Sequence, residues 1–276
     1  MVYVTTYSNN RYTQVIPISD YQLVFTGILV LVTACISALF QLGLLKSLLW
    51  GTIRCVLQLS VVGYALAWIF SVNRFEIVVL VIALMALFAA RTATRRTPNV
   101  SDFPTVLAFL ALVTTTYLVA TIVSLAIIRP TPWYESRIVV PISGMILGNT
   151  VSAITLSIDR LYGEVRSHCN EVEALLSMGA SPWEAVHELV REAIRSAMTP
   201  TINSLMVVGV VSLPGMMTGQ ILGGSDPVEA ARYQIVVMLM ISCAAAVGSM
   251  ILVGLSFRRL FTKGEALRPN LFHSNS

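Results

Sequence analysis

Long apolar runs separated by short polar breaks make up most of this chain. A transmembrane helix needs about 20 residues to cross roughly 30 Å of hydrocarbon. Six charge-free stretches are long enough, and they cover residues 21–45, 55–73, 103–128, 138–158, 196–225 and 233–257. A seventh, residues 77–90, is shorter and spans only if the flanking Arg74, Glu76 and Arg91 snorkel toward the head groups. The pattern predicts an all-α, polytopic membrane protein with about seven transmembrane helices.

The apolar runs stop between the fifth and sixth predicted spans, over residues 164–196. Seven of the chain's fourteen acids lie in this segment or at its edge. Apolar residues recur there at helical spacing in two stripes, which predicts two short amphipathic helices. The first stripe is Val165, Cys169, Val172 and Leu176, and the second is Trp183, Val186, Val190 and Ile194. Stripes of this kind must be buried, and we expect another protein to cover them.

The connection between these two helices carries strong local signals. Gly179 suits the left-handed C-cap of the first helix, where other residues meet a steric cost. Ser181, Pro182 and Glu184 fit the N-cap, the first turn and the closing acid of a capping box. Residues 160–197 are therefore predicted to form a cytosolic helical hairpin inserted into the membrane domain.

The sixth predicted span contains an interruption of its own. Pro200 is expected to open the span, and only residues 201–213 then precede the Pro214-Gly215 pair. A helix of that length rises about 20 Å, which is too short to cross the bilayer. Two interpretations stay open, an ordinary span kinked by proline or a discontinuous helix that lines a translocation pathway. Asn203 is a candidate pathway group in this span.

Polar groups inside other spans are candidates for the same pathway. Arg54 and Gln58 lie one helical turn apart. Arg54 either snorkels to the interface or faces a polar cavity together with Gln58. Asn149 follows Gly144 and Gly148, whose spacing permits close helix packing, so Asn149 either joins two helices or faces the pathway.

Composition and charge support the membrane class and orient the chain. Charged residues make up 12% of the chain, about half the share in soluble domains. If the hairpin is cytosolic, thirteen of the eighteen Lys and Arg residues lie on that side. This predicts a plasma (bacterial inner) membrane protein with its N-terminus outside and its C-terminus in the cytosol. The net charge of +4 then reflects topology rather than nucleic-acid binding.

The same reasoning divides the chain into three parts. Residues 1–19 are predicted to be an external tail, residues 20–257 a single membrane domain that carries the hairpin, and residues 258–276 a cytosolic tail. We expect the last of these to be frayed from residue 264 onward.

The sequence lacks the motifs of common catalytic sites. It contains no Gly-x4-Gly-Lys-Ser/Thr loop, no His-Glu-x-x-His and no Gly-x-Ser-x-Gly. All three histidines lie outside the predicted spans, and the four cysteines show no metal-ligand spacing. The threonines at 114–116 are expected to bond back to their own helix. We therefore expect no enzyme activity and no cofactor bound by this chain alone, and the metal-binding residues stay unassigned.

Several segments carry a resemblance to known permeases. Glu173, Ala174 and Gly179 match positions of the Glu-Ala-Ala-x-x-x-Gly loop of ABC-transporter permeases, with Leu175 in place of the second alanine. More specific matches lie at residues 54–64, 141–149, 177–182, 208–219 and 226–235. Together these segments resemble the bacterial iron-export (FetB-type) permease family, which includes the plant aluminium-sensitivity permeases.

The resemblance implies a permease subunit that works with a separate ATPase subunit, with two copies of each. The partner would bind ATP-Mg, and bacterial members of the family are linked to iron efflux. On this hypothesis the ATPase contact comprises Glu173, Ala174, Gly179, Pro182 and Trp183. The pathway and its hinge comprise Arg54, Gln58, Asn149, Asn203, Pro214 and Gly215. The alternatives are an ABC permease for a nucleotide sugar or another solute, an ATPase-independent carrier or channel, and a non-transporting membrane scaffold.

Overall fold

The computed structural model describes residues 19–41, 43, 45–97, 100, 104–262 and 264–268, which form helices joined by short connections. The chain divides into two compact units, one made of Met1–Asn73 with Gly215–Ala230 and the other of Arg74–Pro214 with Ala231–Ser276. The predicted external tail, apart from Ser19, lies outside the described residues, and so do residues 269–276 of the predicted cytosolic tail.

The first unit contains α1 (Asp20–Phe25), α2 (Gly27–Leu39), α3 (Leu45–Val72) and α9 (Gly215–Leu222). α2 packs against α3, although most apolar side chains along the 28 residues of α3 are exposed. Exposed apolar residues over a helix of this length suit a lipid environment. Thr26, the one residue between α1 and α2, has helical backbone angles (φ −63°, ψ −20°), and the first predicted span, residues 21–45, stays a prediction.

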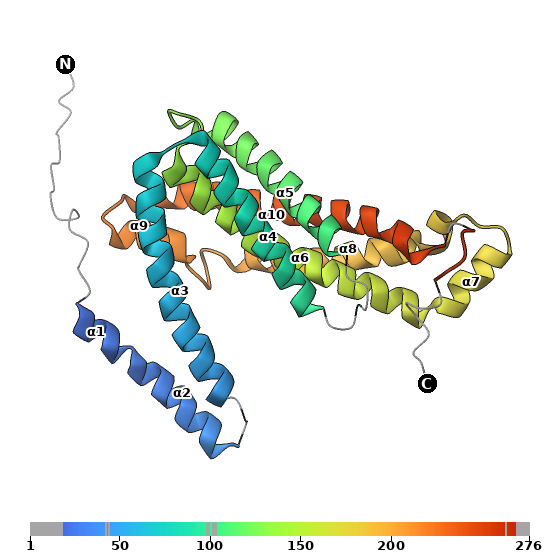
Figure 1. The fold of residues 1–276 in the computed structure, drawn as a ribbon, viewed down its shortest axis with the longest axis horizontal. Coiled ribbons are helices and arrows are strands. Elements are labelled where there is room, and N and C mark those ends of the chain that lie inside the picture. The colour runs from blue at the N-terminus through green and yellow to red at the C-terminus, as the bar shows by residue number, and fades with distance from the viewer. Residues whose placement is uncertain are drawn as a thin grey trace. The chain divides into compact units, whose positions relative to one another are not determined.

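The second unit contains α4 (Phe75–Arg96), α5 (Thr105–Ile122), its π-helical continuation η1 (Val123–Ile128), α6 (Ser136–Ser167), α7 (Cys169–Ser177), α8 (Pro182–Val207), most of α10 (Pro227–Ser256) and η2 (Phe257–Leu260). The 32-residue α6 packs against α4, α5 and α8 (Figure 1). Ile154, Ile158 and Leu161 are fully buried on α6 at spacings of four and three residues, which defines one helical face. α6 is therefore the central helix of this unit.

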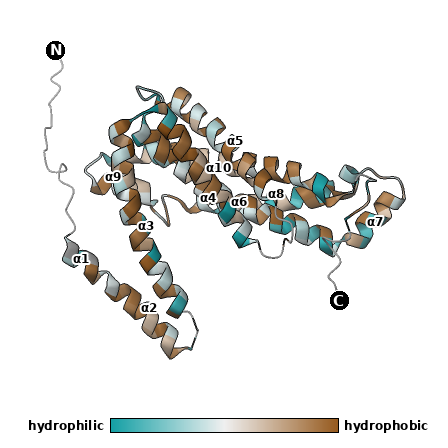
Figure 2. Ribbon diagram, in the orientation of Figure 1, coloured by the Kyte–Doolittle hydropathy of each residue, from teal (hydrophilic) through white to brown (hydrophobic). Residues whose placement is uncertain are grey.

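Five described helices are long and apolar enough to cross a membrane, namely Leu45–Val72, Phe75–Arg96, Thr105–Ile128, Ser136–Ser167 and Pro227–Leu260. In Figure 2, hydrophilic residues gather on α7 and on the adjoining ends of α6 and α8. These findings confirm the predicted all-helical, polytopic class. The short third predicted span, residues 77–90, lies within the 22 residues of α4. The count of seven spans stays a prediction.

Small residues bring helices of the second unit into close contact. A Cβ atom at Gly248 would lie 2.4 Å from Thr150 Cγ2, so α10 approaches α6 more closely than a larger residue permits. A Cβ atom at Gly144 would lie 3.2 Å from Met85 Cε on α4. Around Gly148, by contrast, no described atom lies within 4 Å of the corresponding position. Only one of the two glycines predicted to form a packing face is therefore used for packing in this chain.

The threonines of α5 differ from the sequence-based expectation. Thr115 and Thr116 are fully buried, and their hydroxyls have no hydrogen-bond partner among the described residues. The expectation that they bond back to their own helix is therefore wrong. Thr115 Oγ1 lies 3.5 Å from the position a Gly248 Cβ would take, so it faces the neighbouring α10.

Gly248→Ala should destabilise the folded protein by roughly 1–3 kcal/mol, as overpacking of a tight core does. The added methyl group would meet Thr150 Cγ2, which Thr150→Ser removes, so the double variant should regain most of the lost stability. Thermal unfolding of purified protein in detergent measures both effects. Gly148→Ala is the matched control and should change little. A double variant as unstable as Gly248→Ala would contradict this contact.

Candidate functional site

The turn between α7 and α8 closes the end of α7 with a Schellman arrangement of hydrogen bonds. Gly179 adopts a left-handed conformation with φ of 93°, as predicted. The Gly179 N–H donates to the Leu176 carbonyl (3.0 Å), and the Ala180 N–H donates to the Leu175 carbonyl (3.0 Å). The chain therefore reverses direction with its last helical carbonyls satisfied.

The predicted capping box opens α8. The Glu184 N–H donates to the Ser181 hydroxyl oxygen (3.4 Å), and the Ser181 N–H donates to the Glu184 carboxylate (2.8 Å). Pro182 follows at the start of the helix, where its missing N–H is not needed. Hydrogen bonds from the Ser181 hydroxyl and backbone hold the pKa of the Glu184 carboxyl below its usual value.

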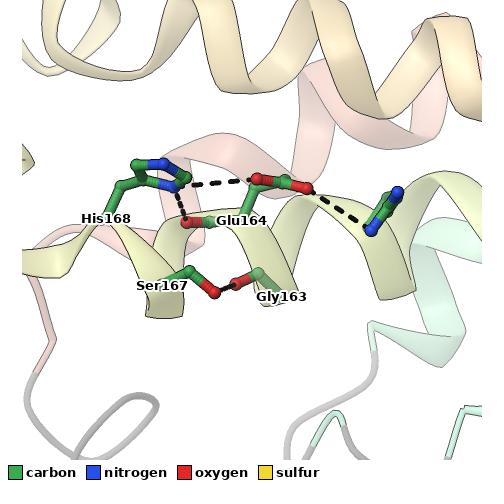
Figure 3. Close-up of polar contacts among 5 residues, drawn as sticks. Gly163, Glu164, Ser167 and His168 are labelled. Atoms are coloured by element: carbon green, nitrogen blue, oxygen red, sulfur yellow. Dashed lines mark hydrogen bonds and ion pairs between the residues drawn. The ribbon is translucent and has the colours of Figure 1, made fainter.

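α6 and α7 meet at His168, where the backbone leaves the helical conformation. The backbone N–H of His168 donates to the Glu164 carbonyl (3.0 Å). In Figure 3, His168 Nδ1 lies 3.0 Å from the same carbonyl oxygen and 3.6 Å from the Glu164 carboxylate. That carboxylate also pairs with Arg160 at 3.4 Å. The prediction that one helix forms the first half of the hairpin is therefore wrong, because its apolar stripe is divided between α6 and α7.

Burial and the adjacent Glu173 carboxylate raise the pKa of the Cys169 thiol.

The two apolar stripes of the hairpin pack inside the chain itself. Four valines of the stripes, and three residues from beyond α10, are buried in the core of the second unit: Val165, Val172, Val186 and Val190, with Leu260, Phe261 and Leu267. The expectation that another protein covers the stripes is therefore wrong for these valines, whereas Trp183 of the second stripe is exposed. Periodicity shows that a helix face is buried, and here the covering residues belong to the same chain.

The tip of the hairpin, residues 173–183 from the second half of α7 to the first turn of α8, remains exposed. The five residues predicted to contact an ATPase all lie at this tip, namely Glu173, Ala174, Gly179, Pro182 and Trp183. Trp183 is 51% exposed, and Met178, which sequence reasoning did not select, is 76% exposed. Leu175 adds further exposed apolar surface. Apolar side chains exposed among polar ones are typical of a protein interaction site.

Residues 257–262 and 264–268, named here the C-terminal strap, fold back against this tip. The Thr262 N–H donates to the Ala266 carbonyl (2.8 Å), and the Arg268 N–H donates to the Leu260 carbonyl (2.9 Å). The expected fraying is therefore wrong for residues 264–268. The Trp183 and Phe257 rings also pack edge to face, with their centroids 5.5 Å apart.

Two hollows separate the strap from the tip. The first, of about 460 Å³, is lined by Glu173 and Gly179 from the tip. The second, of about 370 Å³, is lined by Pro182 and Trp183. Glu265 of the strap lines both hollows. The predicted contact residues therefore share one continuous surface with a segment that their sequence positions did not suggest.

A cavity of about 440 Å³ lies between α6, α8 and α10 in the second unit. Two of the predicted pathway residues, Asn149 and Pro214, line it. The Asn149 side-chain amide donates to the Met145 carbonyl of its own helix (2.9 Å). The other polar groups of the lining are the neutral side chains of Ser152, Thr201, Ser204 and Ser212.

The sixth predicted span is discontinuous. α8 ends at Val207, and residues 208–214 contain no helix before α9 begins at Gly215. The Gly209 N–H donates to the Ser212 carbonyl (2.9 Å), which satisfies part of the backbone within the break. The structure therefore favours the broken helix over the kinked one. Pro200 lies inside α8, so no new helix begins where the sixth span is predicted to open.

The remaining predicted pathway residues are not among the described lining residues of this cavity. Asn203 is exposed on α8, whose lining positions are 197, 200, 201, 204 and 207. Arg54 and Gln58 are exposed on α3 in the first unit, and Gly215 begins α9 in the same unit. Within the described ranges, no group of three His, Cys, Asp or Glu side chains could hold a metal ion.

Comparison with protein families gives one match that covers most of the chain. The family model described as "Uncharacterised protein family (UPF0014)" matches residues 20–261. No solved structure matches the chain.

Alignments with individual relatives cover nearly the whole length of this chain. The UPF0014 membrane protein YjkA of Bacillus subtilis is 36% identical over 253 residues, covering 91% of this chain and 99% of the relative. The "Probable iron export permease protein FetB" of Escherichia coli is 35% identical over 250 residues, covering 91% and 95%. The "Protein ALUMINUM SENSITIVE 3" of Arabidopsis thaliana is 33% identical over 248 residues, covering 90% and 89%.

Ser181→Ala should weaken the start of α8 by about 1 kcal/mol, because it removes the oxygen that accepts the Glu184 N–H. Hydrogen exchange of the amides in the first turn of α8, corrected for intrinsic rates, measures this loss. Ser177→Ala is the matched control, since the Ser177 hydroxyl bonds only to its own helix. Unchanged protection in Ser181→Ala would contradict the capping role.

The pH dependence of hydrogen-exchange protection in the first turn of α8 is a second test of the same cap. The folded-state pKa of Glu184 is lowered, so its contribution is present above the unfolded-state pKa. It is lost as the pH falls through the folded-state pKa. Ser181→Ala should weaken this dependence, because it removes the hydroxyl that donates to the carboxylate and leaves only the backbone N–H of residue 181.

Proposed function

The chain belongs to the UPF0014 family of membrane proteins, and on this premise we propose that it is the permease subunit of an ATP-driven transporter. It forms the membrane pathway, binds no cofactor of its own and has no enzyme activity by itself. A separate ATPase subunit binds ATP-Mg. The observation that carries the proposal is the exposed apolar surface of the α7–α8 turn. This turn is fixed by the C-cap of α7 and the N-cap of α8, and it lies at an otherwise polar end of the helices.

The packing of the hairpin supports a docking role for its tip. Apart from Trp183, the stripes of the hairpin pack within the chain, so the free surface is the tip and the two hollows beside it. Met178 and Trp183 offer apolar contact there, and Glu173 and Glu265 offer carboxylates. A partner ATPase would seat on Glu173, Ala174, Gly179, Pro182 and Trp183.

α8 connects this tip to the cavity. It runs without interruption for 26 residues, about 39 Å, from Pro182 to Val207. Its far end forms one wall of the cavity and leads into the break at residues 208–214. Movement of the tip would therefore shift a pathway wall, with Pro214-Gly215 as the hinge. Arg54, Gln58 and Asn203 stay pathway candidates on the basis of their chemistry in the sequence.

The membrane arrangement is part of the proposal. We place the protein in the plasma (bacterial inner) membrane with seven spans, its N-terminus outside and its C-terminus in the cytosol. This orientation puts the hairpin on the ATP-containing side, and the Lys and Arg distribution supports it. Two permease chains and two ATPase chains would form the working assembly.

The proposed cargo is a metal ion, iron, moved outward, by analogy with the relative named a probable iron export permease. The cavity would pass the cargo along neutral oxygen groups, since its described lining holds no carboxylate or imidazole. A nucleotide sugar or another solute is the alternative cargo for the same machinery.

Met178→Asp should lower ATP-driven transport at least tenfold, because it places a charge in the apolar centre of the proposed docking surface. The partner is first captured by a photo-crosslinking amino acid at position 178 in cells and is accepted only if it carries a Walker A motif. Fe²⁺ transport is then measured in proteoliposomes containing both subunits. Glu192→Lys, an exposed change elsewhere on α8, is the control.

Three outcomes would overturn the proposal. Transport by this chain alone, unchanged by ATP and partner, indicates a carrier or channel. Capture of a partner without ATP-binding motifs indicates a scaffold. Normal transport by Met178→Asp excludes docking at the tip.

Ser204→Phe should block transport while leaving ATPase binding intact, because the new ring fills the cavity at the far end of α8. Transport and co-purification of the ATPase are measured on the same preparation. Thr199→Phe, an exposed change on α8 outside the lining, is the matched control. Equal transport in both variants would exclude this cavity from the pathway.

A further inference from the structure

A second cavity of the second unit, of about 250 Å³, has no part in the proposed transport mechanism. It lies where α4 begins, where α5 passes into η1 and where α6 begins. Its floor is buried and contains Val78, Ile82, Ala120, Ser124 and Val139. Its rim carries the aromatic rings of Phe75, Trp133 and Tyr134. The cavity therefore combines a closed apolar floor with an accessible edge.

The rim is a cluster of Phe75, Trp133 and Tyr134. Each ring contacts both of the others, with centroid distances of 5.5, 5.8 and 5.9 Å. Amphipathic aromatic rings at the ends of membrane-spanning helices typically lie at the level of the lipid head groups. The rim therefore sits where the polar and apolar parts of a lipid meet.

Ser124 gives the floor its one unsatisfied polar group among the described lining residues. Its side chain is 1% exposed, and its hydroxyl has no hydrogen-bond partner in the described part of the chain. Serine in an apolar helix usually bonds back to its own helix. Here Ser124 lies in the π-helical turn η1, and the Arg129 N–H donates to the Ser124 carbonyl (2.9 Å). Turns of this kind are rare and often mark functional sites.

The rest of the lining defines the chemistry that would fit. The Tyr117 hydroxyl lines the cavity but already donates to the Val79 carbonyl (2.7 Å). No charged side chain is present in the described lining. The matching ligand is therefore an uncharged apolar body with one hydrogen-bond acceptor, placed to receive the Ser124 hydroxyl.

The position of the cavity indicates where such a ligand comes from. α4 and α5 with η1 are candidate membrane spans. Leu80, Leu118 and Ile122, next to lining positions on these helices, are exposed apolar residues. The cavity edge is thus continuous with the surface that faces lipid. An acyl chain carries its ester carbonyl near the head groups, at the depth of the aromatic rim.

We propose that this cavity is a binding site for one acyl chain of a membrane phospholipid, whose ester carbonyl oxygen accepts a hydrogen bond from Ser124. A dry cavity of roughly 150 Å³ accommodates benzene. The larger volume here suits a segment of one chain and excludes a whole lipid. The bound chain satisfies the buried hydroxyl and completes the packing between α4, α5 and α6.

The test uses the full chain in vesicles of phosphatidylethanolamine and phosphatidylglycerol. A small fraction of phosphatidylcholine carries a diazirine near the ester end of one chain. After irradiation, mass spectrometry should find labelled peptides from the cavity lining. Ala120→Phe fills the floor and should lower this labelling at least fivefold. Leu118→Phe places the same aromatic ring on the exposed side of α5 and should leave the labelling unchanged.

Ser124→Ala should reduce the labelling by a smaller factor, because it removes the hydrogen bond and keeps the apolar space. Thr121→Phe fills the cavity from its half-exposed edge and replaces Ala120→Phe if that variant unfolds on heating earlier than wild type. Equal labelling in the wild type and a folded filling variant would overturn the proposal. So would labelling spread evenly over the exposed residues of α4 and α5.

Discussion

The packing of α6 against α8 is the contact on which the second unit depends. Fully buried Ile158 and Leu161 of α6 share one core with Val186 and Ala193 of α8. Within hydrocarbon, lipid tails are as apolar as these side chains, so close packing and small residues hold such helices together. At the polar hairpin end, burial from water adds about 1.5–3 kcal/mol for each large apolar side chain. The same helix pair is thus stabilised by different forces at its two ends.

Local features of the hairpin could be predicted because a few adjacent residues determine them. Gly179 supplies a left-handed conformation, and Ser181 with Glu184 closes a cap, whatever surrounds them. The break at His168 and the helical course through Pro200 depend on neighbours instead. A proline costs a helix one hydrogen bond, and tertiary packing can outweigh that cost.

The candidate site likewise depends partly on contacts between residues that are distant in the sequence. The predicted contact residues lie together because they fall within residues 173–183, which one turn joins. The C-terminal strap beside them could not be foreseen, since periodicity indicates a buried face but not which segment covers it. Polarity alone does not place Asn203 on the cavity lining. Its helical phase places it off the lining that Pro200 and Ser204 share.

Burial of the hairpin stripes within the chain limits what a partner can hold. Stable complexes engage roughly 20–30 residues on each side, whereas the free surface here is one turn and two hollows between residues 173–183 and the strap. Under the proposed function, a single docking contact of this size is weak and reversible. In the proposed assembly, two permease chains joined to a pair of ATPase subunits would double the contact, and the second engagement would become effectively intramolecular. A small, rigid tip therefore suits a partner that must stay attached while it moves through each ATP cycle.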